Sequence, residues 1–221
     1  MKTSVRSQIG SSCRTPTSAR RFGRLGFVYG ALAVAGLIFP GQTVRAEGVP
    51  LTVLVYNYTG ASAVTLFSAE REAARILDSA GASVVWVNSW DKRQLSGETG
   101  ELCAKGWTSQ THGLKLISGM NKFLYKEFGV ASIPVYATIY YEEVARRAHN
   151  DNSASELPIL LGCVIAHELG HLLGVRGHST SGIMQPQWGA SQIRQALMES
   201  LLFLKEQKRV IRDQVLMAAN R

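Results

Sequence analysis

Residues Val164–Pro186 read VIAHELGHLLGVRGHSTSGIMQP, and this stretch constrains the architecture of the chain more than any other. Within it, His167 and His171 are four residues apart in an apolar run with helical spacing, so both imidazoles project from one face of a predicted helix. Glu168 directly follows the first histidine and completes the pattern H-E-x-x-H. Two imidazoles on one helix face can share a metal ion, and the sequence therefore predicts a metal site on this helix.

A catalytic zinc ion needs three protein ligands and an open position for water. His167 and His171 supply two ligands, and Gly174 is placed to end the helix so that the chain turns back and brings His178 beneath the metal. The metal would lower the pKa of its water and polarise a carbonyl, while Glu168 acts first as general base and then as proton donor to the leaving amine. We therefore expect Zn²⁺ as cofactor, these three histidines as its ligands, and Glu168 as the catalytic residue.

The segment that starts at His178, HSTSGIMQP, resembles the stretch after the third ligand in the matrixins and other metzincin-clan zinc metallopeptidases. The clan pattern is H-E-x-x-H-x-x-G-x-x-H, and here the third histidine comes one residue later, after Gly177. An extra glycine in a turn can be absorbed as a bulge without moving the ligand far. The resemblance implies that Met184 lies in a tight turn beneath the metal and that Trp188 lines a specificity pocket, although a plain core tryptophan fits the sequence equally well.

The same resemblance implies the fold class and the activity. The expected fold is α+β: a zincin-like single domain in which a twisted mixed β-sheet packs on the active-site helix, with a C-terminal helical segment. The expected activity is that of an endopeptidase that hydrolyses peptide bonds of a peptide or protein substrate by zinc-activated water. The leading alternative is a secreted zinc-binding or protein-interaction module on the same scaffold without turnover. Glu168 separates the two, because a binding module would tolerate its loss and a peptidase would not.

Other residues of suitable chemistry are less well placed for the metal. An acidic residue on a downstream helix is the third ligand in the gluzincins, and Glu199 or Glu206 would fill that role here. His178 is favoured over both, because it is much closer in sequence and the metzincin-like turn follows it. His112 and His149 lie far upstream without partner spacing, so we expect them in loops or at the surface.

The N-terminal region indicates export. Residues 1–24 carry six basic residues and no acidic one, and Leu25–Phe39 form a 15-residue apolar core before small residues at Val44–Ala46. We therefore expect residues 1–46 to be a signal peptide, and residues 47–221 to be a zincin-like catalytic domain that is secreted or periplasmic. An uncleaved membrane anchor is the alternative, but a spanning helix needs about 20 apolar residues, which this run does not reach.

The basic leader accounts for most of the chain's net charge of +8. Residues 1–46 hold seven of the 24 basic residues and none of the 16 acidic ones, which leaves 17 basic and 16 acidic residues beyond them. A net charge near +1 predicts no nucleic-acid partner. The remaining chain of about 175 residues suffices for one compact domain. It lacks an apolar run for stable membrane insertion after cleavage, and we expect it to be a monomer.

The first third of this domain has the pattern of a strand, a helix and a second strand. Leu51–Tyr58 and Ser83–Val87 are rich in β-branched and aromatic residues and predict strands. Residues 62–80 have apolar residues at helical spacing and predict a helix that Gly81 ends. At this length the connection predicts a crossover between two parallel strands.

The middle of the domain predicts a loop and two more strands. Asn88–Gly113, which contains four glycines, is predicted to be a loop that could reach over a cleft. Leu114–Ile117 and Val135–Tyr141 are strand candidates, and the second directly precedes a helix that begins near Leu157 and Pro158. By resemblance to metzincins, this last strand would be the sheet edge where a substrate peptide pairs. Its tyrosines would serve simple sheet packing equally well.

The remaining features concern the C-terminus and the cysteines. Residues from Ser191 to Met217 are helical by spacing, and the pattern allows a break near Leu201–Leu204. Cys103 and Cys163 remain after loss of the leader, and an exported protein could join them in a disulfide. Cys163, however, lies on the apolar side of the predicted active-site helix, where a buried free thiol is at least as well supported.

Overall fold

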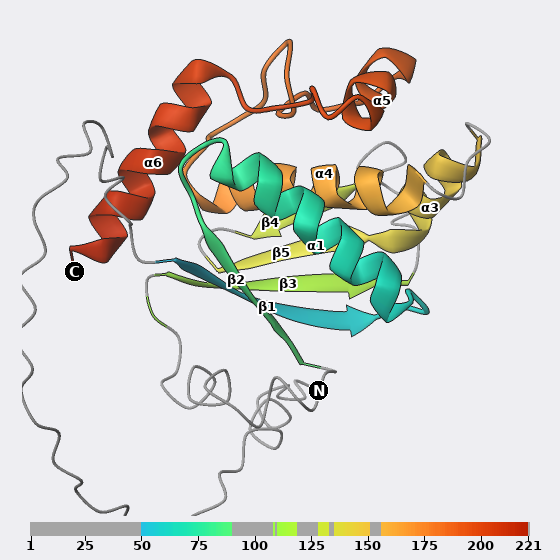
Figure 1. Ribbon diagram of the computed structural model, residues 1–221, viewed down its shortest axis with the longest axis horizontal. Helices are drawn as coiled ribbons and strands as arrows, with labels where there is room; N and C mark the ends of the chain where they lie inside the picture. The colour runs from blue at the N-terminus through green and yellow to red at the C-terminus, as the bar shows by residue number, and fades with distance from the viewer. Residues whose placement is uncertain are drawn as a thin grey trace, which may run out of the picture. The chain divides into compact units, whose positions relative to one another are not determined.

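A five-stranded mixed sheet forms the base of the α+β fold, and the described helices are arranged around it. The computed structural model describes residues 50–89, 108, 110–118, 128–132, 135–150 and 156–220. The elements follow in the order β1 (Leu51–Tyr58), α1 (Ala63–Asp78), β2 (Val84–Asn88), β3 (Thr111–Ile117), β4 (Gly129–Ser132), β5 (Tyr136–Tyr140), α3 (Tyr141–Asn150), α4 (Leu157–Leu172), α5 (Ala190–Leu197) and α6 (Lys205–Ala219) (Figure 1). They belong to one compact unit, Gly48–Arg221, which is compatible with the predicted single domain.

The N-terminal predictions fall outside this description. The expected signal peptide, residues 1–46, lies wholly outside the described residues, and so does Cys103. Among the helices that the structure describes, none is long and apolar enough to cross a membrane.

The predicted strand-helix-strand unit is present as β1, α1 and β2. The two strands pair in parallel, as the crossover predicts. The hydroxyl of Ser62 accepts a hydrogen bond from the backbone N–H of Thr65 at 3.1 Å and so caps the start of α1. Gly81 follows the helix at a φ of 89°, a left-handed conformation that glycine adopts without a steric penalty. The predicted limits of this unit are therefore confirmed to within a few residues.

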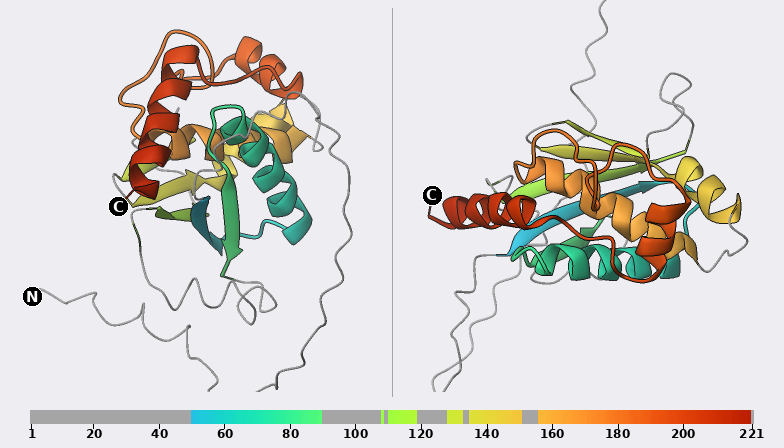
Figure 2. Two further views of the ribbon diagram at one scale, coloured as in Figure 1. Left: turned by 60° about the vertical axis from the view of Figure 1, so that its left-hand side comes forward. Right: turned by 90° about the horizontal axis from the view of Figure 1, so that it is seen from above.

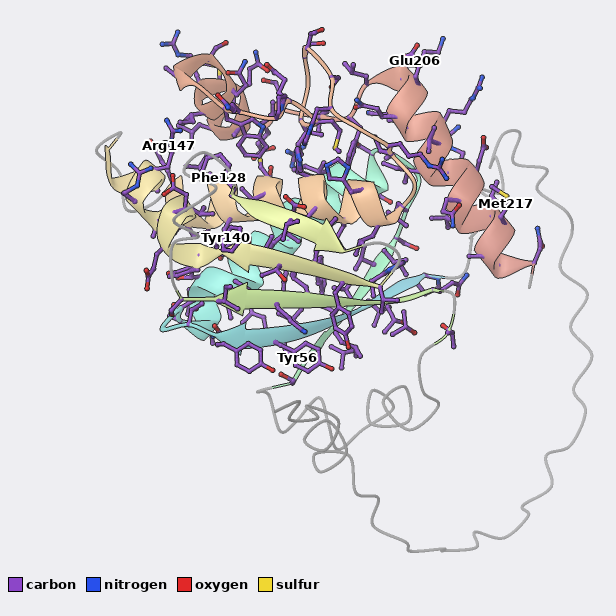
Figure 3. The ribbon with its side chains drawn as sticks, turned by 180° about the vertical axis from the view of Figure 1, so that it is seen from behind. Tyr56, Phe128, Tyr140, Arg147, Glu206 and Met217 are labelled. Carbon is purple, nitrogen blue, oxygen red and sulfur yellow. The ribbon has the colours of Figure 1, made fainter. Side chains whose placement is uncertain are left out.

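One face of the sheet is covered by helices. The strand order is β2-β1-β3-β5-β4, and α1 and α4 pack side by side against the sheet, as the two views of Figure 2 show. Side chains alternate along β1, so that Leu51, Val53 and Val55 are buried in the core that the sheet shares with these helices. Tyr56 lies on the opposite face (Figure 3). Each fully buried aliphatic side chain contributes about 1.5–3 kcal/mol to folding.

The sheet edge differs from the prediction. Val135–Tyr141 was expected to be the edge strand, whereas β5 lies inside the sheet between β3 and β4. The edge is β4, which pairs with β5 in antiparallel orientation. Tyr141 starts α3, so a helix separates β5 from α4. The sequence did not reveal β4 because its four residues, GVAS, are too few to display an alternating pattern.

The predicted loop Asn88–Gly113 is partly wrong, because β3 already begins at Thr111. His112, expected in a loop or at the surface, is a strand residue with only 6% of its surface exposed. His149 lies in helix α3 and not in a loop. A glycine within a strand weakens the strand pattern, and Gly113 explains why the start of β3 was missed. Residues 90–107 of the predicted loop lie outside the described residues.

Helix α4 is buried over most of its length and carries the candidate site. It begins at Leu157 with Pro158 in its first turn, as predicted. It crosses α1 so closely that a Cβ atom on Gly162 would lie 2.6 Å from the Cβ of Glu72 and 2.7 Å from the carbonyl oxygen of Ala69. Gly162 therefore permits the two helices to touch, and this contact fixes α4 on the sheet.

The C-terminal segment contains two helices with a break between them, as the spacing allowed. Residues 198–204 connect α5 to α6, and Leu201 and Phe203 in this connection are buried in the core. Both side chains pack on the domain because the connection runs back over α4, where Phe203 contacts Gly170. The connection thereby helps to hold the segment that follows α4.

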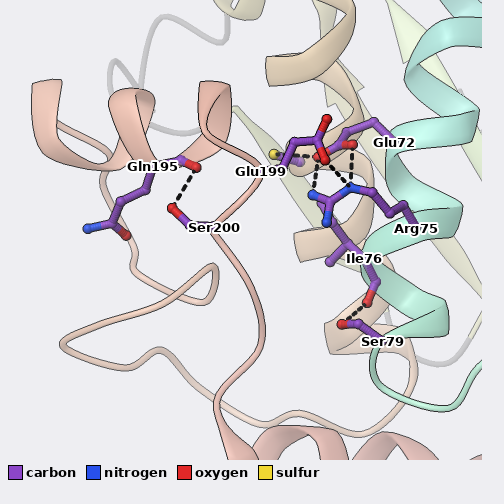
Figure 4. A network of polar contacts seen from close by, with 8 residues as sticks. Glu72, Arg75, Ile76, Ser79, Gln195, Glu199 and Ser200 are labelled. Atoms are coloured by element: carbon purple, nitrogen blue, oxygen red, sulfur yellow. Dashed lines mark hydrogen bonds and ion pairs between the residues drawn. The ribbon is translucent and has the colours of Figure 1, made fainter.

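A polar network ties α1, α4 and this connection together (Figure 4). Arg75 donates two hydrogen bonds to Glu72, at 2.8 and 2.6 Å, and its Nε lies 3.9 Å from a carboxylate oxygen of Glu199. The thiol of Cys163 is fully buried and donates to Glu72 at 3.9 Å. Cys163 is a free thiol in the structure, and its burial raises its pKa.

Glu70 on α1 is a buried carboxyl group. One oxygen accepts a hydrogen bond from the Asn88 amide at 3.3 Å, and the other, Oε1, has no hydrogen-bond partner among the described residues. Burial raises the pKa of Glu70 to about 7. The protonated form is therefore favoured in the folded protein at mildly acidic pH.

We expect Glu70→Gln to reduce the pH dependence of folding stability. A carboxyl whose pKa rises on folding stabilises fully below about pH 4.5, and this contribution is lost as the pH rises through about 7. The loss amounts to about 1.4 kcal/mol for each pKa unit, and an amide does not titrate. Urea unfolding at about pH 5 and about pH 8, with the exposed Glu142→Gln as control, measures the difference between variant and wild type. Parallel pH dependences of wild type and Glu70→Gln would contradict the prediction.

Candidate metal centre

Three histidines converge on one point, as predicted. Their candidate ligand nitrogens all lie within 4.8 Å of one another. The ring centroids of His167 and His171 are 4.9 Å apart, and that of His178 lies 5.4 and 5.1 Å from them. His167 is buried, His171 is half-buried and His178 is exposed, so the cluster opens to solvent on the side of His178. Three close imidazoles of this kind could hold a metal ion.

The two helical histidines are held by backbone carbonyl groups. Nδ1 of His167 lies 2.8 Å from the carbonyl oxygen of Ile183, and Nδ1 of His171 lies 2.9 Å from that of Val175. A carbonyl oxygen only accepts hydrogen bonds, so Nδ1 must carry the proton in each ring. The lone pair of each neutral imidazole is then on Nε2, the atom left for a metal.

The protonation state of these rings also suits metal binding. Burial lowers the pKa of His167 to about 4, since a low-polarity environment disfavours the charged imidazolium. Burial lowers the pKa of His171 in the same direction. Both rings are therefore neutral near pH 7 and do not have to lose a proton before they bind a metal.

The chain reversal that places His178 depends on two glycines. Gly174 ends the helical run at a φ of 90°, and Gly177 has a φ of 71°, both in the left-handed region that favours glycine. The turn predicted at Gly174 is confirmed. The additional glycine before His178 is accommodated as a second left-handed residue, so the longer spacing still brings the third histidine to the other two.

The segment that follows His178 forms a turn that backbone hydrogen bonds hold in place. The backbone N–H of Ser179 donates to the carbonyl of Met184 at 2.9 Å, and that of Ile183 donates to the carbonyl of Leu202 at 3.0 Å. Met184 is fully buried. A Cβ atom on Gly170 would lie 3.2 Å from the Met184 sulfur, so this side chain packs against α4 between the two helical histidines in sequence. Met184 therefore lies in a turn that packs against α4, and its place beneath a metal stays a prediction.

An open cleft of about 330 Å³ lies over the histidines. Its walls come from β4, from α4 and from the segment Gly177–Trp188, and Glu168 is among the lining residues. Trp188 lines the cleft although only 3% of its surface is exposed, and its indole N–H donates to the Ile183 carbonyl at 3.3 Å. Trp188 is thus a buried residue in the wall of the cleft, and its part in a specificity pocket stays a prediction.

Glu168 lies directly against the edge strand. It is 4% exposed, and a Cβ atom built on Gly129 would lie 2.9 Å from both its Cγ and its Oε1. Only a residue without a side chain leaves this room. No sequence pattern singles out Gly129, because its contact with Glu168 joins two elements whose residues lie 39 positions apart.

The edge strand exposes backbone groups to the cleft. The carbonyl of Phe128 accepts a hydrogen bond from the N–H of Tyr140 at 2.8 Å, so the backbone groups of Phe128 and Val130 turn toward β5. By the alternation of an antiparallel ladder, Gly129 and Ala131 turn theirs away from β5 toward the open edge. Gly129, Val130 and Ala131 all line the cleft.

The alternative acidic ligands are elsewhere. Glu199 lies beside Arg75, and Glu206 is an exposed residue on α6 (Figure 3), and neither belongs to the histidine cluster. His178 is therefore the third member of the group among the described residues. In comparisons with known proteins, no family model matches the chain and no curated sequence matches it.

Proposed function

We propose that the chain is an exported, zinc-dependent endopeptidase of metzincin-like type. The observation that carries this proposal is the convergence of three imidazoles beside a buried glutamate at the base of an open cleft. The resemblance of the sequence HSTSGIMQP to the metzincin segment supports the proposal, and so does the turn in which the buried Met184 packs against α4. The basic leader followed by an apolar run supports export to a secreted or periplasmic location.

Zn²⁺ is the metal that this donor set favours. Three neutral imidazoles are one of the ligand sets of catalytic zinc sites, and they leave one position open. His167, His171 and His178 would hold the ion, and the open side of the cluster faces the cleft. When bound there, zinc supplies Lewis-acid polarisation of a carbonyl and a water of lowered pKa.

Glu168 is the group that moves the proton. Its carboxylate accepts a proton from the attacking water as the water oxygen forms a bond to the carbonyl carbon. The same group then gives that proton to the leaving nitrogen as the carbon–nitrogen bond breaks, so Glu168 returns to its starting state. Contact with Gly129 keeps the carboxylate at the edge of the cleft, where a substrate backbone would lie.

The substrate peptide binds as an added strand on β4. The outward-facing backbone groups of Gly129 and Ala131 provide hydrogen-bond donors and acceptors for an extended chain. Antiparallel pairing is the more stable of the two orientations. In that orientation, the part of the peptide C-terminal to the cleaved bond lies beside Phe128, at the start of β4. Trp188 would then line the pocket for a side chain on this part.

Metal analysis of the purified protein and of His178→Ala tests the proposal. We expect one zinc per chain and chelator-sensitive casein hydrolysis in the wild type. Removal of an outer-shell partner lowers metal affinity roughly 10- to 100-fold, and the variant should lose more zinc affinity than this because it lacks a ligand. Its hydrolysis should be lost together with the zinc. Glu206→Ala, which alters the alternative ligand, should keep both. Zinc retention by His178→Ala, with loss in Glu206→Ala, would contradict the three-histidine site.

A further inference from the structure

Arg147 on α3 is a cation beside the cleft without a carboxylate partner among the described residues. Its guanidinium carbon lies 5.8 Å from the ring centroid of Phe128, and its buried Nε has no hydrogen-bond partner within the part of the chain that the structure describes. Figure 3 shows Arg147 and Phe128 at the same end of the sheet, far from α6. A guanidinium on an aromatic face keeps its edge N–H groups available for a planar anion.

The acidic residue nearest to Arg147 along its own helix is already paired. Glu143 lies one turn earlier, at the spacing that would normally pair with Arg147. Both of its carboxylate oxygens instead accept hydrogen bonds from Arg146, with the Nε contact at 3.0 Å. Arg146 is thus the partner of Glu143, and among the described residues no carboxylate pairs with Arg147, which leaves its guanidinium as a candidate for an external carboxylate.

Phe128 connects Arg147 to the cleft. Its ring centroid lies 5.5 Å from that of Trp188, which lies 6.1 Å from that of His167. Phe128 and Trp188 both line the cleft. The Arg147 guanidinium therefore lies beyond Phe128, the wall residue at the start of β4. An extended chain advances roughly 3.3 Å per residue, so a few substrate residues would span the distance from the histidines to Arg147.

We propose that Arg147 binds a carboxylate of the substrate on the C-terminal side of the cleaved bond. This proposal rests on the proposed function and on antiparallel pairing with β4. The proposed substrates are peptides that carry an acidic side chain, or their own terminal carboxylate, on the C-terminal side of the cleaved bond. A guanidinium binds either carboxylate through two parallel N–H bonds.

Cleavage of paired synthetic peptides tests the assignment. Each pair differs in Asp against Asn, or Glu against Gln, at one position, and each peptide is made with a free and an amidated C-terminus. We expect the wild type to prefer the carboxylate peptides by about 10- to 100-fold in kcat/KM, the value of a charge-assisted hydrogen bond. A preference that survives amidation identifies an acidic side chain, and one that amidation abolishes identifies the terminal carboxylate.

Variants then attribute the preference to Arg147. Arg147→Met should reduce it to within about threefold, while Arg147→Lys should retain a part because the charge remains but the planar fork is lost. Arg209→Met, which removes an exposed charge on α6, should behave as the wild type. Zinc content and circular dichroism show whether each variant is folded. An unchanged preference in Arg147→Met, or no carboxylate preference in the wild type, would overturn the proposal.

A binding measurement separates this proposal from the proposed function. Zinc-loaded Glu168→Gln should bind the carboxylate peptides more tightly than their amide partners by a similar factor, and addition of Arg147→Met should remove the difference. If the wild type cleaves no peptide but this difference is found, the peptidase proposal fails and the carboxylate site stands. If cleavage is found without any carboxylate difference, only the assignment to Arg147 fails.

Discussion

Glu168→Gln should retain one zinc per chain and lose about 100- to 10,000-fold of its peptide hydrolysis, the usual contribution of a general acid–base group. The amide is nearly the same size as the carboxylate, so the contact with Gly129 and the arrangement of the histidines should be preserved. What the amide lacks is the capacity to accept the proton of the attacking water. Zinc content and kcat/KM measured on the same samples give the result.

Glu206→Gln is the matched control for this variant. Glu206 is an exposed residue on α6, and the same chemical change there should leave both zinc content and hydrolysis unaltered. Full hydrolysis by Glu168→Gln would exclude the proposed mechanism. Zinc binding by the wild type without hydrolysis of any peptide would instead favour the alternative of a zinc-binding module without turnover.

Gly129→Ala should lower kcat about 100-fold with little loss of zinc, because displacement of a reacting group by about 1 Å can cost that much. A Cβ atom on Gly129 would lie 2.9 Å from Glu168 Oε1 and 2.8 Å from the carbonyl oxygen of Thr138. Either Glu168 or the edge strand must therefore move. Steady-state kinetics and metal analysis measure the two effects separately.

Gly60→Ala provides the control for Gly129→Ala, because a Cβ atom on Gly60 meets no atom within 4 Å. It should leave kcat and zinc content at wild-type values. If Gly129→Ala kept full kcat, the contact between β4 and Glu168 would have no part in the reaction. If it lost zinc as well, the strand would be needed to hold the histidines and not the glutamate.

Local patterns predicted the parts of the fold that depend on sequence neighbours. The β1–α1–β2 unit, the limits of α4 and the break between α5 and α6 follow from periodicity and from glycine and proline positions. The edge strand could not be predicted in this way. The four residues of β4 form the edge strand only because they pair with β5. The same pairing places β5 inside the sheet and not at its edge.

Some residues of the candidate site were predictable from local sequence, and others were not. The three histidines lie within 12 residues, so the helix spacing and one turn were sufficient to predict that they meet. Gly129 and Arg147 come from other elements and match no local pattern. His112 shows the opposite error, because a histidine without partner spacing can still be a buried strand residue.

The main-chain support of His167 and His171 has a consequence for how this site can change. Their partners are the carbonyl oxygens of Ile183 and Val175, which every amino acid possesses. In sites where a carboxylate side chain holds the ligand ring, exchange of that one side chain alters metal affinity. Here a substitution at either supporting position keeps the acceptor atom. A change in how these two candidate ligands are supported therefore requires insertion, deletion or reshaping of the loop itself.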